Sequence, residues 1–192
     1  MDLRRGIIET ANALGMNPID LATIISYETA GTFDPTKAGP TTQWGQHRGL
    51  IQFGEPQARQ YGVDWNDPLG SQLGADGAIV RYYRENGWRP GMNMLDAYSI
   101  VNAGAPGRYN ASDANNGGAP GTVADKVNDQ MDAHRAKAIA LLGGDFALPE
   151  QQPTQMADNQ LRAPDFQIQP LDPAAFMRPR NRLALQPITV NV

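Results

Sequence analysis

The chain has 192 residues, 41% of them hydrophobic, and a formal net charge of −4 at pH 7, so one domain with a sizeable core is expected. The negative charge argues against nucleic acid as a partner, because binding to a phosphate backbone depends on Lys and Arg. The absence of cysteine excludes disulfides, thiolate metal sites and a cysteine nucleophile, and with only two histidines we expect no metal centre and no cofactor.

The N-terminal segment predicts two helices. Apolar residues at helical spacing predict an amphipathic helix that begins near Leu3 and ends at Gly15. Asn17 is a suitable N-cap for a second helix, because Pro18 then occupies the first turn, where its missing N–H is not needed. This second helix runs through Glu28 and ends at Gly31.

The middle of the chain predicts a loop followed by two helices. Residues 34–54 lack helical periodicity, are rich in Gly, Thr and Pro, and contain the short apolar stretch 50–53, so we expect an irregular loop with a small strand or hairpin. Glu55 and Pro56 open a short helix. Asp67 and Pro68 open a longer one, which apolar spacing extends as far as Gly87.

Two more helices are predicted before residue 143. Asn93 begins the first, which carries Tyr98 and Val101. After a loop over residues 104–121, Thr122 caps a last helix whose apolar stripe continues to Leu142. The predicted fold class is therefore mainly α, with one small β-hairpin.

Residues 144–192 differ in composition from residues 1–143. Repeated prolines exclude long helices there, and glutamines replace the aliphatic stripe, so we divide the chain into a domain over 1–143 and an extended Pro/Gln-rich tail over 144–192. The tail's apolar residues come singly. Both a disordered extension and a docking arm that becomes ordered on a partner remain open.

Glu28 interrupts an apolar face. On a helix it lies above Ile24 and Ile25, with Leu21 one turn earlier. Burial and the negative end of the helix dipole both raise the pKa of a carboxyl group, and a protonated carboxyl is what a general acid requires. The alternative is a glutamate at a helix end that simply reaches solvent.

Three motifs in order resemble the soluble lytic transglycosylase family of the lysozyme-like superfamily. The first is residues 24–35, Ile-Ile-Ser-Tyr-Glu-Thr-Ala-Gly-Thr-Phe-Asp-Pro. The second is Gly-Leu-Ile-Gln-Phe at 49–53, with Tyr-Gly at 61–62. The third is Asn-Ala-Gly at 102–104, followed by Pro-Gly at 106–107.

This resemblance covers roughly residues 7–142, and it implies an α+β lysozyme-like fold with helices around a cleft. It also implies cleavage of the β-1,4 MurNAc–GlcNAc bond in peptidoglycan glycan strands. Glu28 would first protonate the leaving oxygen and then act as a base, so that the sugar's 6-hydroxyl closes a 1,6-anhydro ring. The substrate-binding residues implied or suggested are Gln52, Tyr98, Asn102 and Trp44.

The sequence departs from the family pattern at Val101, where the family has tyrosine. Tyr98, one turn earlier, could supply the missing hydroxyl, although a core or stacking role suits it equally. Without that hydroxyl, a structural virion protein that keeps the fold and lacks activity is an alternative. Gln52 could instead tie the hairpin together by hydrogen bonding.

A hydrolytic lysozyme is a further alternative, because Asp34 could provide the second carboxylate that hydrolysis normally needs. Asp34 precedes Pro35, however, and is interpreted rather as a turn former.

Trp44 is the tryptophan favoured for stacking on sugar. His47 could touch substrate, whereas His134 is expected to be a hydrogen-bonded core residue.

Location is inferred from what the sequence lacks. No apolar run reaches the roughly 20 residues of a membrane span, so no membrane insertion is expected. Glu9 and Asn12 interrupt the N-terminal region, so no Sec export is expected. The chain resembles transglycosylases carried in phage virions, in the tail or the internal core. Residues 144–192 would then dock on other virion proteins, and the enzyme would act in the host periplasm to aid genome entry.

Overall fold

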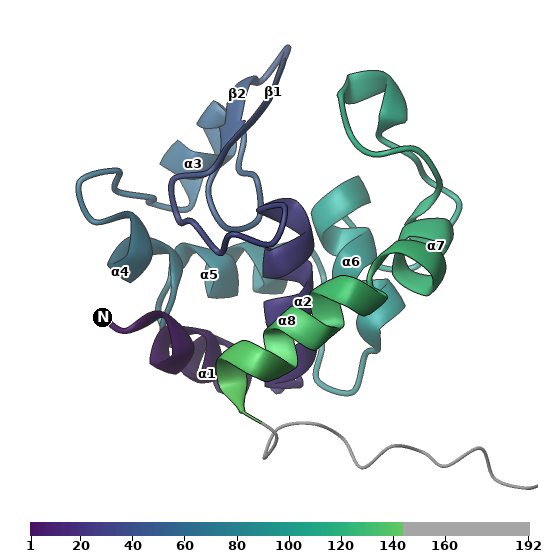
Figure 1. Ribbon diagram of the computed structural model, residues 1–192. Coiled ribbons are helices and arrows are strands. Elements are labelled where there is room, and N and C mark those ends of the chain that lie inside the picture. The colour runs from purple at the N-terminus through teal and green to yellow at the C-terminus, as the bar shows by residue number, and fades with distance from the viewer. Residues whose placement is uncertain (144–192) are drawn as a thin grey trace, which may run out of the picture. The chain divides into compact units, whose positions relative to one another are not determined.

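The computed structural model describes residues 1–143, and in this part the protein is mostly helical with one two-stranded antiparallel sheet (Figure 1). The mainly α class with a small β element is confirmed at this level. The predicted docking tail lies outside the described residues. The elements, in chain order, are α1 (Leu3–Leu14), α2 (Pro18–Glu28), β1 (Ala38–Thr42), β2 (Gly45–Arg48), α3 (Glu55–Gln60), α4 (Pro68–Gln72), α5 (Ala78–Glu85), α6 (Met94–Ala103), η1 (Ala114–Asn116), α7 (Val123–Asp125), η2 (Lys126–Gln130) and α8 (Asp132–Leu142).

Helix starts follow local chemistry. The side chain of Asn17 accepts a hydrogen bond from the backbone of Ile19, and Asn93 caps α6 in the same way. Thr122 begins α7 with a reciprocal capping box, in which its hydroxyl and the carboxylate of Asp125 each satisfy a backbone N–H. All three predicted caps are therefore confirmed.

The predicted long helix from Asp67 to Gly87 is wrong, because the structure divides it into α4 and α5. Helix α4 ends at Gln72, because Leu73 is extended; Gly74 then adopts φ +94°, and its N–H donates to the hydroxyl of Thr10 on α1 at 2.7 Å. At Gly77 the chain turns so tightly that a Cβ would lie 2.5 Å from the carbonyl oxygen of Gln72. The hydrogen bond to Thr10 and the backbone conformations at Gly74 and Gly77 therefore interrupt the helix that the apolar periodicity predicts.

The predicted hairpin is present, and it precedes the apolar stretch. β1 pairs with β2 in antiparallel fashion, with an irregularity in register between Ala38 and Thr41. Leu50, Ile51 and Phe53 form a buried turn after β2. The small strands are polar because they project from the domain, while the apolar turn behind them anchors the hairpin to the core.

The last predicted helix is interrupted. α7 continues directly into the π-helical segment η2, and α8 begins only at Asp132. A π segment places one extra residue in a helical turn. Lys126, the first residue of η2, is fully buried.

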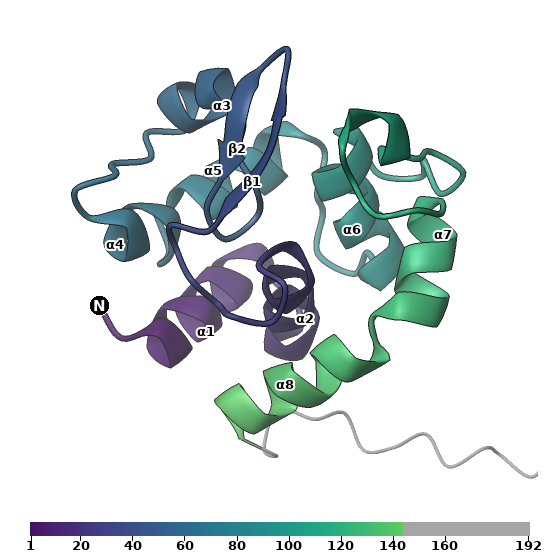
Figure 2. The same ribbon diagram turned by 45° about the horizontal axis from the view of Figure 1, so that its top comes forward.

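Helix α2 lies at the centre and packs against α1 and α8. Its apolar residues are fully buried and join a single core with residues from the surrounding helices. Figures 1 and 2 show the hairpin and the α6–α7 segment on opposite sides of the C-terminal end of α2. None of the helices in the described part is both long and apolar enough to span a membrane.

Candidate active site

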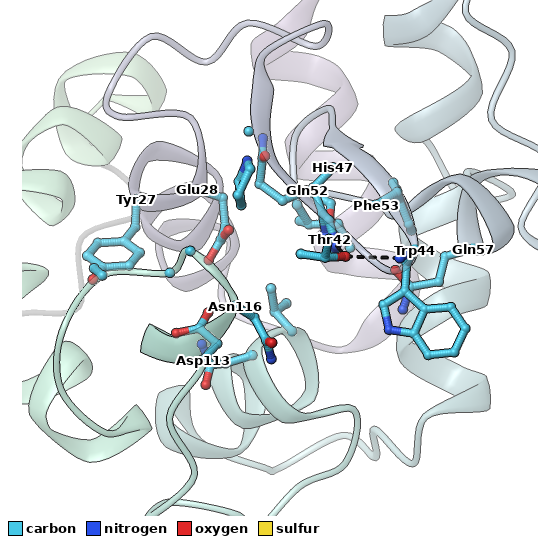
Figure 3. A pocket seen from close by; sticks show the side chains of 18 of the residues that line it. Tyr27, Glu28, Thr42, Trp44, His47, Gln52, Phe53, Gln57, Asp113 and Asn116 are labelled. Carbon is cyan, nitrogen blue, oxygen red and sulfur yellow. Dashed lines mark hydrogen bonds between the residues drawn. The ribbon is translucent and has the colours of Figure 1, made fainter.

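A cavity of about 920 Å³ opens at the C-terminal end of α2. One wall comes from the hairpin and the turn after it, and the other from α6, the following loop and η2. The cavity brings together the predicted catalytic residue and the four predicted substrate-binding residues, namely Glu28, Trp44, Gln52, Tyr98 and Asn102. Figure 3 shows Glu28 between the two walls.

Glu28 is the last residue of α2, and its carboxyl group faces this cavity. Burial raises its pKa from 4.5 to about 7, and the negative charge of Asp113 adds to the rise. A hydrogen bond from Tyr98 and the positive charge of Lys126 act in the opposite direction. The prediction that Glu28 has a raised pKa is confirmed, with burial as the main cause.

Tyr98, on α6, lines the same cavity as Glu28. Its ring is almost completely buried and meets the ring of Tyr27 edge-on, with centroids 5.5 Å apart. The Tyr98 hydroxyl acts on the Glu28 carboxyl as a hydrogen-bonding group that lowers the pKa of Glu28, and burial raises the pKa of Tyr98 far above its ordinary value, so it stays a proton donor. Tyr98 is therefore both a packed residue and a polar partner of Glu28.

Tyr27, next to Glu28, fixes the second wall to α2. Its hydroxyl donates a hydrogen bond of 2.6 Å to the side chain of Gln130 on η2, and the amide of Gln130 in turn donates to the carbonyl of Pro120. Burial raises the pKa of Tyr27 to about 12. This hydrogen-bonded chain holds α2, η2 and the loop before α7 together.

Asp113 and Lys126 were not predicted from the sequence. Both line the cavity, and their side chains form an ion pair in which the Lys126 side chain is only 1% exposed and that of Asp113 is 32% exposed. They come from a loop and from the π segment, so no helical or strand periodicity marks them. In the sequence, the one indication of a special role was that Lys126 lies among the apolar residues of the last predicted helix.

Gln52 ties the hairpin together, one of the two roles that the sequence left open, and it also lines the cavity. Its amide nitrogen ties the hairpin base by donating to the carbonyls of Lys37 and Gly49. Its Oε1 atom is buried and, within residues 1–143, has no hydrogen-bond partner. Gln52 also has φ +56°, a strained conformation for a residue with a side chain, and such strain is common at functional sites.

Asn102 is buried at both polar atoms of its amide. Neither Oδ1 nor Nδ2 has a hydrogen-bond partner among the described residues. Buried amides are nearly always paired, so this one is a candidate for contact with a ligand or a bound water. Its neighbour Val101 lines the same cavity and provides no hydroxyl.

Trp44 lies at the turn of the hairpin and is 56% exposed. Its backbone N–H donates to Thr42, so the turn itself is ordered while the indole remains free on the cavity rim (Figure 3). His47 lies behind it, with one ring nitrogen at 3.0 Å from the Thr42 hydroxyl and the other at 2.9 Å from the carbonyl of Gln52. An exposed indole beside polar groups is suited to stacking on a flat ligand face.

The other two tryptophans have packing roles. Trp88 is buried and donates its indole N–H to the carbonyl of Leu14. Trp65 lies under the guanidinium of Arg48, 4.4 Å from the ring centroid. Neither lines the large cavity.

Asp34 does not supply a second carboxylate to the cavity. It is exposed, does not line the cavity, and accepts hydrogen bonds from the backbone and the hydroxyl of Thr36, which lower its pKa. The turn-former interpretation is confirmed.

His134, expected in the core, is half-buried; it contacts the Ser26 hydroxyl at 2.9 Å and also lines the cavity.

The chemistry available in the cavity is that of oxygen and nitrogen groups. Residues 1–143 contain no cluster of three or more His, Asp or Glu side chains arranged to hold a metal ion. The cavity offers one carboxyl that gains and loses a proton near neutral pH, one charged pair, and two amides with free hydrogen-bonding atoms. These groups are suited to acid/base chemistry on a polar ligand.

Comparison with known proteins gives no relative. No family model matches the chain, and no curated protein and no solved structure matches it either.

Proposed function

We propose that this protein cleaves the glycan strands of peptidoglycan at the β-1,4 MurNAc–GlcNAc bond by a lytic transglycosylase reaction. The observation that carries the proposal is the carboxyl group of Glu28, which faces a large cavity and has a pKa raised to about 7. Such a carboxyl is protonated often enough near neutral pH to act as an acid and ionised often enough to act as a base. The motif resemblance of residues 24–35, 49–53 and 102–104 supplies the substrate class.

In this mechanism Glu28 serves twice. Its proton goes to the leaving glycosidic oxygen as the C1–O bond breaks. The resulting carboxylate then takes the proton of the same sugar's 6-hydroxyl while O6 bonds to C1, which gives a 1,6-anhydro end and restores the acid. Tyr98, hydrogen-bonded to Glu28, would orient the carboxyl in both steps, the role for which the family uses the tyrosine that Val101 replaces.

The remaining cavity groups fit a glycan. Asn102 and the Oε1 atom of Gln52 are free to bond hydroxyl or acetamido groups, and the exposed indole of Trp44 offers a surface for a sugar ring. A lysozyme-like arrangement of helices around the cleft, with a small hairpin on one side, belongs to the same proposal.

Hydrolysis to a reducing end is the second candidate. It is favoured by Asp113, a second carboxylate lining the same cavity, because hydrolases normally use such a group to position or activate water. Product mass separates the two outcomes, since a 1,6-anhydro end is one water lighter than a hydrolytic end.

The test of cleavage is zymography on purified peptidoglycan with the wild type and Glu28→Gln. Clearing by the wild type that is lost in the variant is the expected result. Clearing that survives the substitution would remove Glu28 from its assigned role. No clearing by the folded wild type would favour a structural protein without activity.

For biological context, we propose that a phage virion carries the protein, in its tail or internal core, and that it acts on the host cell wall during genome entry. Residues 144–192 would dock on other virion proteins. Truncation after Gly143 should prevent incorporation into particles while leaving the purified domain active. Normal incorporation of the truncated chain would contradict the docking role.

A further inference from the structure

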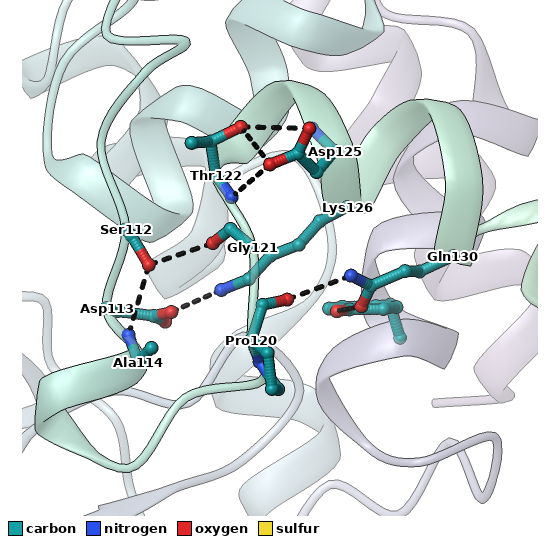
Figure 4. A network of polar contacts seen from close by, with 10 residues as sticks. Ser112, Asp113, Ala114, Pro120, Gly121, Thr122, Asp125, Lys126 and Gln130 are labelled. Atoms are coloured by element: carbon teal, nitrogen blue, oxygen red, sulfur yellow. Dashed lines mark hydrogen bonds and ion pairs between the residues drawn. The ribbon is translucent and has the colours of Figure 1, made fainter.

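The ion pair between Lys126 and Asp113 is an unusual feature for a small domain. The Lys126 side chain is 1% exposed, and its ammonium group donates to Asp113 Oδ1 (Figure 4). Removing charges from water is unfavourable, and apolar side chains of similar size usually fill such a space at least as well. Stability alone therefore does not explain why this lysine lies beneath the cavity.

The surrounding backbone fixes both partners. Thr122 and Asp125 form the capping box that begins the helix directly before Lys126. On the other side, the Asp113 carboxyl packs so closely on Gly118 that a Cβ there would come within 2.2 Å of it. The pair therefore has one defined position, which Figure 4 shows between the loop and the π segment.

The loop that carries Asp113 is closed at its base. The hydroxyl of Ser112 donates to the carbonyl of Gly121 at 2.8 Å, and the N–H of Gly118 donates to the carbonyl of Asp113 at 3.1 Å. η1 lies inside this loop. A short, internally bonded loop holds a carboxylate in place better than an open one would.

Both charges act on Glu28. The charge of Asp113 raises the pKa of Glu28, and also that of Tyr27 and Tyr98 on the same side of the cavity. The charge of Lys126 lowers the pKa of Glu28. The two partners thus have opposite effects on one carboxyl.

Other titratable groups near Glu28 are mainly tyrosines, which are uncharged near neutral pH. The groups around Glu28 and along its cavity are Tyr27 on α2, Tyr82 and Tyr83 on α5, Tyr98 on α6, Asp113 in the loop, Lys126 on η2, His134 on α8, and Lys37 and His47 at the hairpin. Of these, Asp113 and Lys126 are the fully charged groups that act on the Glu28 pKa.

We propose that Asp113 and Lys126 are positioning residues for Glu28: a buried ion pair, held in the wall of the cavity that Glu28 faces, whose two opposite charges act on the Glu28 carboxyl. The pair exchanges no proton. It keeps both forms of Glu28 accessible, which a residue that acts first as acid and then as base requires. This inference rests on the proposed function for its purpose, but the charge effect can be measured without any activity.

The test is a titration of Glu28 by NMR in the full chain labelled with carbon-13 in its glutamate carboxyl groups. The sequence has five glutamates, and the signal missing in Glu28→Gln identifies Glu28. In Asp113→Asn the midpoint should fall by about one pH unit, because the remaining ammonium favours ionisation. In Lys126→Met it should rise by about the same amount, and in the double variant it should return close to that of the wild type.

Asp113→Asn is the deciding variant, because asparagine keeps the shape and can still accept a hydrogen bond from Lys126. Lys126→Met leaves a carboxylate without its partner and is the variant more prone to unfold. An unchanged or raised midpoint in folded Asp113→Asn would overturn the proposal, whatever Lys126→Met does. Movement of both single variants in the same direction would overturn it as well.

The matched control is the ion pair between Arg135 and Asp20, at 2.9 Å, which joins α8 to α2 away from the cavity. Asp20→Asn and Arg135→Met should leave the Glu28 midpoint unchanged, and a shift equal to that of the cavity variants would overturn the assignment.

If peptidoglycan is not cleaved but the midpoints move as expected, the proposed function fails and the charge pair stands. If cleavage occurs and the midpoints do not move, only the charge pair fails.

Discussion

The two parts of helix α2 have opposite chemistry. The residues from Leu21 to Ser26 are buried, and Leu21 and Ile24 have no exposed surface. The buried hydroxyl of Thr23 has a hydrogen-bond partner, because it donates to the carbonyl of Ile19 at 2.6 Å. The C-terminal end of the helix presents Glu28 to a cavity that Gln52 and Asn102 also line, and Gln52 Oε1 and both amide atoms of Asn102 have no partner within residues 1–143. One helix therefore supplies stability along its length and a reactive group at its end, and substitutions in the two parts should have different consequences.

The largest effect is expected at Glu28. Glu28→Gln should lower cleavage of peptidoglycan by about 10²–10⁴-fold, the usual contribution of a general acid/base. At pH 8 the same variant should raise the free energy of unfolding by up to about 3 kcal/mol, because a carboxyl whose pKa rises from 4.5 to about 7 on folding is ionised at a penalty in the folded wild type. Urea unfolding measures this gain.

The sign of the pH dependence follows from the same pKa. Between pH 4.5 and about 7 the folded protein retains a proton on Glu28 that the unfolded chain has lost, so wild-type stability falls as pH rises through this window. The advantage of Glu28→Gln should therefore be present at pH 8 and absent at pH 4. An equal advantage at both pH values would show that ionisation of Glu28 is not its cause.

In the body of the helix, Leu21→Ala should lower the free energy of unfolding by about 2–5 kcal/mol, because it opens a cavity in a fully buried site. The folded fraction should cleave glycan at the wild-type rate per molecule. Denaturant unfolding and activity corrected for the folded fraction provide the measurement. A specific loss of turnover in the folded protein would mean that the two parts of α2 are not separable.

A pair of tyrosines sharpens the comparison. Tyr98→Phe removes the hydrogen bond to Glu28 and should reduce kcat about tenfold or more, since hydrogen bonds to charged groups contribute about 1.5–3 kcal/mol. Tyr83→Phe removes a buried hydroxyl that has no partner within the described residues, so activity should be unchanged and stability equal or slightly higher. Equal losses in the two variants would indicate that Tyr98 acts only through packing.

The smallest effect is expected at Asn102. Asn102→Leu keeps the approximate volume and removes an unpartnered buried amide, so the free energy of unfolding should rise by about 1–2 kcal/mol. KM for glycan fragments should rise, because the amide is then no longer available to the substrate. A loss of stability instead would indicate that a bound water normally satisfies the amide.

Local chemistry made much of the fold predictable. The caps at Asn17, Asn93 and Thr122 could be recognised from a few neighbouring residues, and so could the turn at Asp34. The break between α4 and α5 could not, because it depends on a hydrogen bond between Gly74 and Thr10, far apart in the sequence.

The residues of the site likewise differ in whether they could be predicted from the sequence. Glu28 was recognisable because an acidic residue on an apolar helical face is locally anomalous, and the structure confirms its raised pKa. Asp113 was not, because its significance depends on Lys126 and on the path of a glycine-rich loop. The unpartnered state of Asn102 is likewise visible only when every neighbour is known.

The π segment η2 acts as a phase shift between α7 and α8. One residue in an α-helix corresponds to a rotation of about 100° around the helix axis. We expect deletion of one residue within Val127–Gln130 to rotate Lys126 away from Asp113, because the residues before the deletion then turn relative to those after it. The direction of the Lys126 side chain therefore depends on the length of this segment as well as on the residue type.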